Sequence, residues 1–189
     1  MVSGLVASPS LANTRRLTII AQDPSVRIGG RILTTEIDIP AEELLPGPCG
    51  YRINVIDYDS TNNVLYEPAE LEFRNGQYID PFSKDSPRGG TPAVFNRSLL
   101  SNPRFHAQNA YAIAMRILAR FEFALGRRSA WGSDGHQLHV APHAFAEANA
   151  FYSKEDRSLY LGYFAGASGH AIYTCLSRRC GARNDPRAT

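Results

Sequence analysis

Alternating apolar and polar positions along the first part of the chain predict β-strands. The segments 17–22 and 31–39 are rich in β-branched residues, and each runs into a turn that contains proline. The segment 51–56 alternates in the same way, with apolar residues on one face. We therefore predict a β-rich N-terminal subdomain over residues 16–80.

Two short segments near position 75 carry the clearest hairpin signal. Residues 71–73 and 77–79 have strand-like composition, and Asn75-Gly76 between them suits a two-residue turn. The acidic segment 57–63 is also predicted to be a hairpin turn. A calcium loop is the alternative, but this segment lacks the glycine and the closing glutamate of an EF-hand.

A helical period replaces the alternation after residue 101. Asn102 suits the N-cap, Pro103 the first helical position and Gly126 the end of the helix. Apolar residues recur at steps of three and four along one side of this helix: Ala110, Ala114, Ile117, Leu118, Phe121 and Leu125. At roughly two dozen residues the helix would span about 35 Å, long enough to bury a continuous stripe across a small sheet.

The predicted fold class is α+β, with N-terminal antiparallel strands, one long amphipathic helix and then a mixed or antiparallel sheet. Pro, Gly, Ser and Arg dominate residues 81–101, which we predict to be a connecting loop. Residues 102–177 would form the helix and the sheet. Residues 1–15 are expected to be a disordered leader, and residues 178–189 a disordered, Arg-rich tail.

Composition narrows the classes of partner. With 189 residues and 43% hydrophobic content, the chain can bury a core. The net charge is +2, and the segment from Ser177 onward contains four arginines and one aspartate, so the basic excess belongs to the tail. This gives no reason to expect nucleic-acid binding.

Cysteine usage and the N-terminal segment favour a reducing compartment. Three cysteines at irregular spacing do not indicate a disulfide framework. The N-terminus lacks the basic and continuous apolar regions of a signal peptide, and no window reaches the ~18 apolar residues of a membrane span. A cytoplasmic protein without a membrane partner is expected.

Three histidines within eight residues, His136, His139 and His143, raise the possibility of a metal site, since imidazole is a common zinc ligand. In a strand His136 and His139 would point to opposite faces, and Pro142 excludes a helix that would bring His139 and His143 together. We therefore expect exposed or capped histidines. His106 and His170 are expected to be isolated.

The segment Asn149-Ala150-Phe151-Tyr152, followed by the apolar run 159–164, resembles the edge of the active-site cleft in thermolysin-like zinc metallopeptidases, the gluzincins. The resemblance covers most of residues 17–177, and its most specific motif is these four residues. It implies the N-terminal lobe of such an enzyme. It also implies that Asn149 and Ala150 hydrogen-bond the main chain of an extended peptide, while Phe151 and Tyr152 pack beside that strand.

The sequence lacks the residues that bind zinc and carry out catalysis in this family. The resemblance implies a zinc cofactor held by a His-Glu-x-x-His helix and a downstream glutamate, yet no such motif occurs in the chain. We therefore expect a truncated and catalytically inactive metallopeptidase homologue, separated from its catalytic half by a frameshift or truncation near Ser177. A natural disordered terminus is the alternative.

Two other classes of function stay open. The chain is a stand-alone module that binds a peptide or a protein through a sheet edge, or it is an enzyme that uses Glu147, Glu155 and Asp156 as acid and base. If the chain is a truncated enzyme, the inner faces of the helix around Ile117 and Phe121 and of the strand around Tyr163 stay partly uncovered, which predicts self-association.

Overall fold

The computed structural model describes residues 14–70, 72–74, 77–83, 91–132, 135–165 and 172–174 of the chain. Within these residues the fold is a mixed α+β arrangement with helices and several sheets. The expected tail, His170 and the turn Asn75-Gly76 lie outside the described residues. The expected leader lies mostly outside them too, but its last two residues, Thr14 and Arg15, already belong to the first strand.

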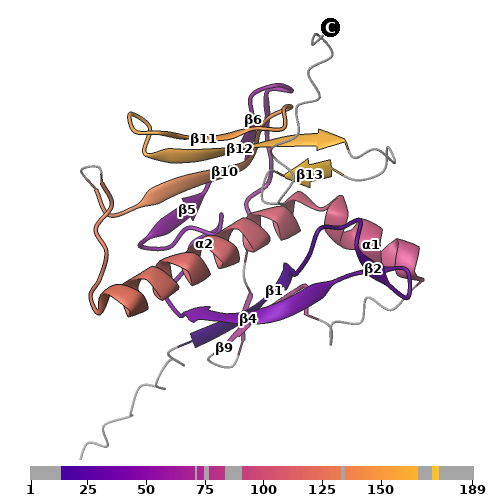
Figure 1. Cartoon of the computed structure of the whole chain (residues 1–189), viewed down its shortest axis with the longest axis horizontal. Helices are drawn as coiled ribbons and strands as arrows, with labels where there is room; N and C mark the ends of the chain where they lie inside the picture. The colour runs from indigo at the N-terminus through magenta and orange to yellow at the C-terminus, as the bar shows by residue number, and fades with distance from the viewer. Residues whose placement is uncertain are drawn as a thin grey trace, which may run out of the picture.

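A long helix lies between two β layers (Figure 1). One layer is the antiparallel pair β1 (Thr14–Ile20) and β4 (Thr34–Pro40). The helix is α2 (Pro103–Leu125). The other layer is a sheet in which β5 (Ile53–Val55), β10 (Leu138–Phe145), β12 (Ser158–Ala165) and β11 (Ala150–Ser153) lie side by side.

The sheet is mixed, as one of the two sequence expectations allowed. β10 runs parallel to both β5 and β12, whereas β11 runs antiparallel to β12. A further strand, β13 (Ile172–Thr174), pairs antiparallel with β12. The order β11-β12-β10-β5 therefore places β11 at one end of the sheet.

The chain also forms short hairpins outside the two layers. They are β2 (Arg27–Ile28) with β3 (Arg31–Ile32), β6 (Tyr58–Asp59) with β7 (Val64–Leu65), and β8 (Glu72–Arg74) with β9 (Gln77–Ile79). The second and third confirm the hairpins predicted at 57–63 and near position 75. In the β6–β7 loop Asn63 has φ 55°, a left-handed conformation that asparagine tolerates well.

The ends of α2 follow the sequence signals. The Asn102 side chain accepts the N–H of Arg104, Pro103 occupies the first turn, and Gly126 ends the helix with φ 63°. Glycine adopts this left-handed conformation at little cost, which is why it is common after helices. The predicted helix and both of its caps are confirmed.

The expected connecting loop at 81–101 is wrong over its last part, because α1 (Pro92–Leu100) forms there. Thr91 caps this helix by accepting the N–H of Val94. Asn96, which is buried, joins it to β3: its Oδ1 accepts the N–H of Ile32 at 2.9 Å and its Nδ2 donates to the Gly30 carbonyl at 2.9 Å. The Asn96 side chain thus holds this helix against the β2–β3 hairpin.

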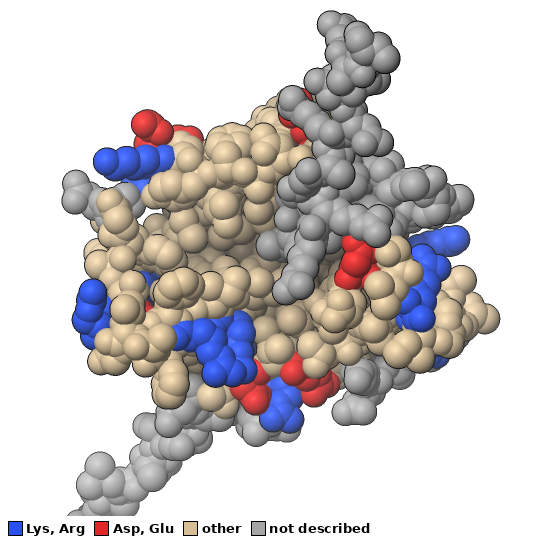
Figure 2. All heavy atoms as spheres, viewed as in Figure 1, with Lys and Arg blue, Asp and Glu red and all other residues tan. Residues whose placement is uncertain are grey.

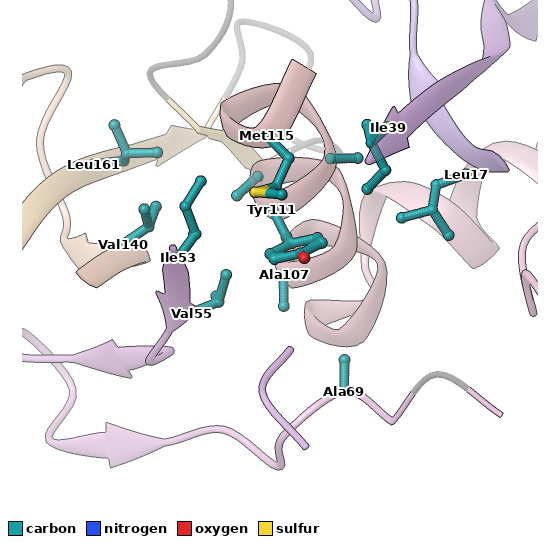
Figure 3. Close-up of a cluster of buried hydrophobic side chains, with 12 residues drawn as sticks. Leu17, Ile39, Ile53, Val55, Ala69, Ala107, Tyr111, Met115, Val140 and Leu161 are labelled. Atoms are coloured by element: carbon teal, nitrogen blue, oxygen red, sulfur yellow. The ribbon is translucent and has the colours of Figure 1, made fainter. Parts of the chain in front are cut away.

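The main hydrophobic core joins both β layers through α2 (Figure 3). Leu17 and Ile39 approach the helix from the β1–β4 layer, and Tyr111 and Met115 lie on the helix. The sheet contributes Ile53, Val55, Val140 and Leu161 from the other side. Burying one such large apolar side chain contributes roughly 1.5–3 kcal/mol, so this contact fixes the sheet relative to the helix.

The C-terminal half of α2 buries less than the predicted continuous stripe. Ala110 and Leu118 are buried, but Ile117 and Phe121 are 52% and 62% exposed, and Leu125 is also exposed. The buried residues concentrate instead between Phe105 and Ala112. Among the described residues, no helix is long and apolar enough to cross a membrane.

Candidate functional site

The strand β11 carries three of the four residues singled out by the sequence, with Asn149 immediately before it. Its register pairs Ala150 with Leu161 and Tyr152 with Leu159 of β12. No described strand pairs with the other side of β11, which lies along the top of the sheet in Figure 1. The structure thus brings the four residues together at an open edge.

Alternate residues of β11 turn their main chain toward this edge. The N–H of Gly162 donates to the carbonyl oxygen of Asn149 at 2.7 Å, so that position belongs to a hydrogen-bonded pair. Bonded and non-bonded pairs alternate in an antiparallel ladder, which turns the main chain of Ala150 and Tyr152 away from β12. The Ala150 N–H is held by Asn149 Oδ1 at 2.8 Å. Tyr152 therefore presents both its N–H and its carbonyl to the edge.

A glycine in β12 allows the chain to enter β11 closely. A Cβ at Gly162 would lie 2.0 Å from the Glu147 carbonyl oxygen and 2.8 Å from that of Asn149. The loop is anchored on its far side, where the N–H of Ala146 donates to Thr61 Oγ1 at 2.8 Å. Any larger residue at Gly162 would displace the start of the strand.

Aromatic rings cover one face of the edge. The Phe151 ring lies 5.6 Å from the Phe145 ring in a stacked arrangement, and 5.2 Å from the Tyr160 ring. Phe151 is nevertheless 48% exposed. Such offset aromatic pairs stiffen the strand and leave apolar surface for a neighbour.

The other face of the edge carries a pocket of about 250 Å³. Tyr152, which is 49% exposed, forms one side of it. The remaining lining residues come from the loop after α2, the start of β10 and the β11–β12 turn: Trp131, Gly132, Gln137, Leu138, Lys154 and Arg157. The sequence analysis did not identify this pocket, because its walls come from three separate segments.

The Trp131 wall of the pocket is held in place by polar contacts. Its indole N–H donates to the His136 carbonyl at 3.0 Å, and the Arg52 guanidinium lies 5.2 Å from the ring centroid. Arg52 also pairs with Glu122 at 2.9 Å and donates to the Ser129 carbonyl at 2.5 Å. The loop after α2 is therefore tied both to the helix and to the residue preceding β5.

A second polar group lies in the interior, between α2 and the sheet. Nδ1 of His106 is 2.7 Å from Nε2 of His143, and Nδ1 of His143 is 2.8 Å from the nearer carboxylate oxygen of Asp57. All three residues are buried. Both rings stay uncharged when His106 donates to His143 and His143 donates to the carboxylate.

Two sequence expectations are wrong at this cluster: His143 is buried rather than exposed or capped, and His106 is not isolated. An irregularity of β10 explains the difference. The register against β12 shifts between Ala141 and Phe145, around Pro142, which cannot donate to the ladder. Val140 and His143 both face α2, although a regular strand would place residues three apart on opposite faces.

The buried position determines how these histidines titrate. Burial first, and the electrostatic interaction with His143 second, lower the pKa of His106 to about 3, against the weaker opposing effect of the Leu99 and Leu100 carbonyls. This buried group links the helix to the sheet through hydrogen bonds. We therefore assign the cluster a structural role.

An adjacent network links the β6–β7 hairpin to β12. The Tyr163 hydroxyl donates to Asp59 Oδ2 at 2.6 Å and accepts from Asn62 Nδ2 at 2.7 Å. Burial and the Asp59 contact raise the pKa of Tyr163 to about 12. Burial opposes ionisation of Asp59, but hydrogen bonds from Tyr163, Asn62 and Thr61 outweigh it and lower the pKa of that carboxyl. The acidic groups of the segment 57–63 thus accept hydrogen bonds from other groups of the protein.

The other candidate metal ligands lie elsewhere. His136 is exposed and its ring stacks on Tyr51, with centroids 5.5 Å apart. His139 is half-buried in β10, where its main chain bonds to Arg157. Within the part of the chain that the structure describes, no group of three or more His, Cys, Asp or Glu residues could hold a metal ion.

The three carboxylates considered as acid and base are exposed on or near the β11–β12 hairpin. The Ser153 hydroxyl donates to Asp156 at 2.8 Å, and the Tyr160 hydroxyl donates to the same group at 3.1 Å. Ser153 also contacts Glu155 at 3.3 Å. Glu147 contributes its carbonyl to the turn before β11. These contacts order the hairpin, and they place no carboxylate in a desolvated site.

Comparison of this chain with protein-family models, with curated proteins and with solved structures found no match. The candidate site is therefore defined by geometry alone, and its centre is the open edge of β11 with the pocket beside Tyr152.

Proposed function

We propose that the edge of β11 binds an extended polypeptide by adding it to the sheet as a further strand. The observation that carries the proposal is the outward main chain of Tyr152 at the end of the sheet. Each main-chain hydrogen bond formed there would contribute roughly 0.5–1.5 kcal/mol. Side chains of the bound strand would alternate between the Phe151 face and the pocket face.

The resemblance to thermolysin-like peptidases agrees with this proposal, since it assigns peptide binding to the same residues, Asn149 to Tyr152. In that family the edge strand lies beside a zinc ion that hydrolyses the bound peptide. The sequence of this chain contains no His-Glu-x-x-His motif through which zinc would be held. Our proposal for this chain is therefore binding without hydrolysis, and a peptidase-like origin remains part of the proposal.

The test begins with a phage-displayed library of random decapeptides selected on the purified protein. Enriched peptides are synthesised, and their dissociation constants are measured by fluorescence anisotropy. Single N-methyl groups are then placed at each position in turn. Because only the carbonyl groups of Ala150 and Tyr152 on β11 face the edge, N-methylation should weaken binding about tenfold or more at the two peptide positions, two residues apart, whose N–H groups meet them, and little at the position between.

Two variants separate main-chain pairing from side-chain contact. Tyr152→Pro removes the outward N–H, a position at which an edge strand tolerates proline, and should weaken binding about tenfold. Tyr152→Ala keeps that N–H but removes the ring. A library that yields no binder, or binders that respond equally to N-methylation everywhere and ignore Tyr152→Pro, would overturn the proposal.

A further inference from the structure

We infer that the pocket beside Tyr152 makes this edge selective for peptides that carry a large apolar side chain and, two residues away toward the β11–β12 turn, a carboxylate. The inference rests on the proposed function, and it adds the class of peptide that the edge recognises. It follows from the position, the size and the charge of the pocket.

Position comes from strand geometry. The peptide residue opposite Tyr152 would direct its side chain to the same face as the Tyr152 ring, with the two Cβ atoms about 5.5 Å apart. The pocket lies on that face, and Tyr152 and Leu138 are among its lining residues. The side chain opposite Tyr152 therefore enters the pocket, while its two neighbours lie on the Phe151 face.

Size and lining favour one apolar side chain. A volume of about 250 Å³ is below the ~300–1,000 Å³ of sites that take whole small molecules. The apolar and aromatic residues in its lining are Trp131, Leu138 and Tyr152. The contacts that Arg52 and the His136 carbonyl make with Trp131 fix one wall before any ligand arrives, which lowers the cost of ordering on binding.

Charge supplies the second element of recognition. Lys154 and Arg157 line the pocket at the turn between β11 and β12. The turn is closed by the Arg157 N–H bonding to the Lys154 carbonyl, and Arg157 has φ 51°. Glu155 and Asp156, the acids of the same turn, are hydrogen-bonded to the Ser153 hydroxyl.

The spacing of the motif follows from these positions. Residues two apart on a strand share a face and are separated by about 6.6 Å. An acidic side chain two residues from the apolar one would therefore lie beside Lys154, on the pocket side of the edge. A free C-terminal carboxylate at that end of the peptide supplies the same chemistry.

The test uses a reporter that the chain already carries. Trp131 is the only tryptophan in the sequence, so intrinsic fluorescence reports directly on the pocket. The probe is an acetylated and amidated octapeptide of threonine with one phenylalanine and, two positions on, one glutamate. Companion peptides replace phenylalanine by serine, replace glutamate by glutamine, reverse the order of the two residues, or end in a free carboxylate in place of the glutamate.

We expect the phenylalanine–glutamate peptide, in one of its two orders, to shift Trp131 emission on binding. The serine peptide should bind at least tenfold more weakly without the shift, and the glutamine peptide about fivefold more weakly. The free-carboxylate peptide distinguishes a terminal from a side-chain anion. Lys154→Glu should remove the advantage of glutamate over glutamine, and a lysine in the glutamate position should then restore binding. Arg120→Glu, the same charge change on an exposed position of α2, should leave this preference intact.

The two proposals fail in different ways. Peptides that show alternate N-methyl sensitivity but no Trp131 shift and no dependence on Lys154 would overturn the inference and leave strand addition standing. Peptides that shift Trp131 but tolerate every N-methyl group would overturn strand addition, and the selectivity inference with it. Equal binding of all the companion peptides would overturn the inference outright.

Discussion

At the scale of single residues, the polar side chains that contribute most to stability are buried and hydrogen-bonded to one another. His106, His143 and Asp57 form a chain between α2 and the sheet, and all three are shielded from water. The cost of leaving one of these groups unpaired is about 1–3 kcal/mol, larger than the gain from a typical exposed pair. Within this chain of contacts, the shifted pKa of His106 makes stability depend on pH.

His106 predicts a loss of stability in mild acid. Its pKa is about 3 in the folded protein, because of burial first and of His143 second, and about 6.5 in an unfolded chain. Between these values the unfolded state binds a proton that the folded state does not, so stability falls as the pH falls below 6.5. The contribution of His106 should drop by about 2 kcal/mol between pH 7 and pH 5.

Urea unfolding at several pH values measures this effect. His106→Gln should unfold with a weaker pH dependence than the wild type by about that amount. The exposed His136→Gln serves as the matched control, and it should follow the wild-type curve. Parallel curves for His106→Gln and the wild type would contradict the assignment.

At the scale of elements, the sequence predicts pieces whose signals are local. The signals for the caps of α2, for the β6–β7 turn and for the strands β1 and β4 each involve residues close together in the sequence, and each of these elements is confirmed. α1 was missed although Thr91 and Pro92 form a local cap signal, because the surrounding Pro, Gly and Ser predict a loop and the contact from Asn96 to Gly30 and Ile32 spans more than sixty residues. The composition of 81–101 carries no trace of that contact.

The candidate site likewise has one part that the sequence predicts and other parts that it does not. The four residues of the edge could be named from the sequence because they are consecutive. The pocket could not, since Trp131 and Lys154 meet only after β10 and β11 have folded. The His106 cluster was hidden by the irregularity of β10, which turns His143 to the helix face. The position of His106 between Phe105 and Ala107, in the first turns of α2, was the one local signal that it is buried.

Gly162 tests how β12 shapes the edge. Gly162→Ala places a Cβ 2.0 Å from the Glu147 carbonyl oxygen, so the start of β11 must move. We expect a loss of about 2–3 kcal/mol in the free energy of unfolding, in the range of overpacked sites. Gly126→Ala is the matched control, because its left-handed conformation is strained but nothing lies within 4 Å, and it should cost only about 1 kcal/mol. Equal costs in the two variants would show that β11 does not depend on this close approach.

At the scale of the whole molecule, two surfaces can promote association: the exposed end of α2 and the open edge of β11. Ile117 and Phe121 are more than half exposed on a helix whose N-terminal half is buried. Exposed apolar surface of this kind promotes association in water. A sheet edge promotes it too, through unpaired main-chain groups.

Variants distinguish the two surfaces. We expect sedimentation velocity to show concentration-dependent association of the wild type at roughly tens of micromolar, because the apolar contact is small. The double variant Ile117→Ser and Phe121→Ser should reduce this association, because it removes the apolar face of α2, whereas Tyr152→Pro should not. Association that Tyr152→Pro abolishes and the double variant leaves unchanged would show that two copies pair through β11 instead.

The most direct test of strand addition at β11 is amide hydrogen exchange at Tyr152, measured by NMR with and without a saturating selected peptide. In the free protein the Tyr152 N–H faces the open edge and should exchange rapidly, while the Phe151 and Ser153 amides, which face β12, exchange slowly. The account predicts that the peptide slows exchange at Tyr152 at least tenfold and changes Phe151 and Ser153 far less. A peptide that binds at saturation while the Tyr152 amide still exchanges at its free rate would contradict it.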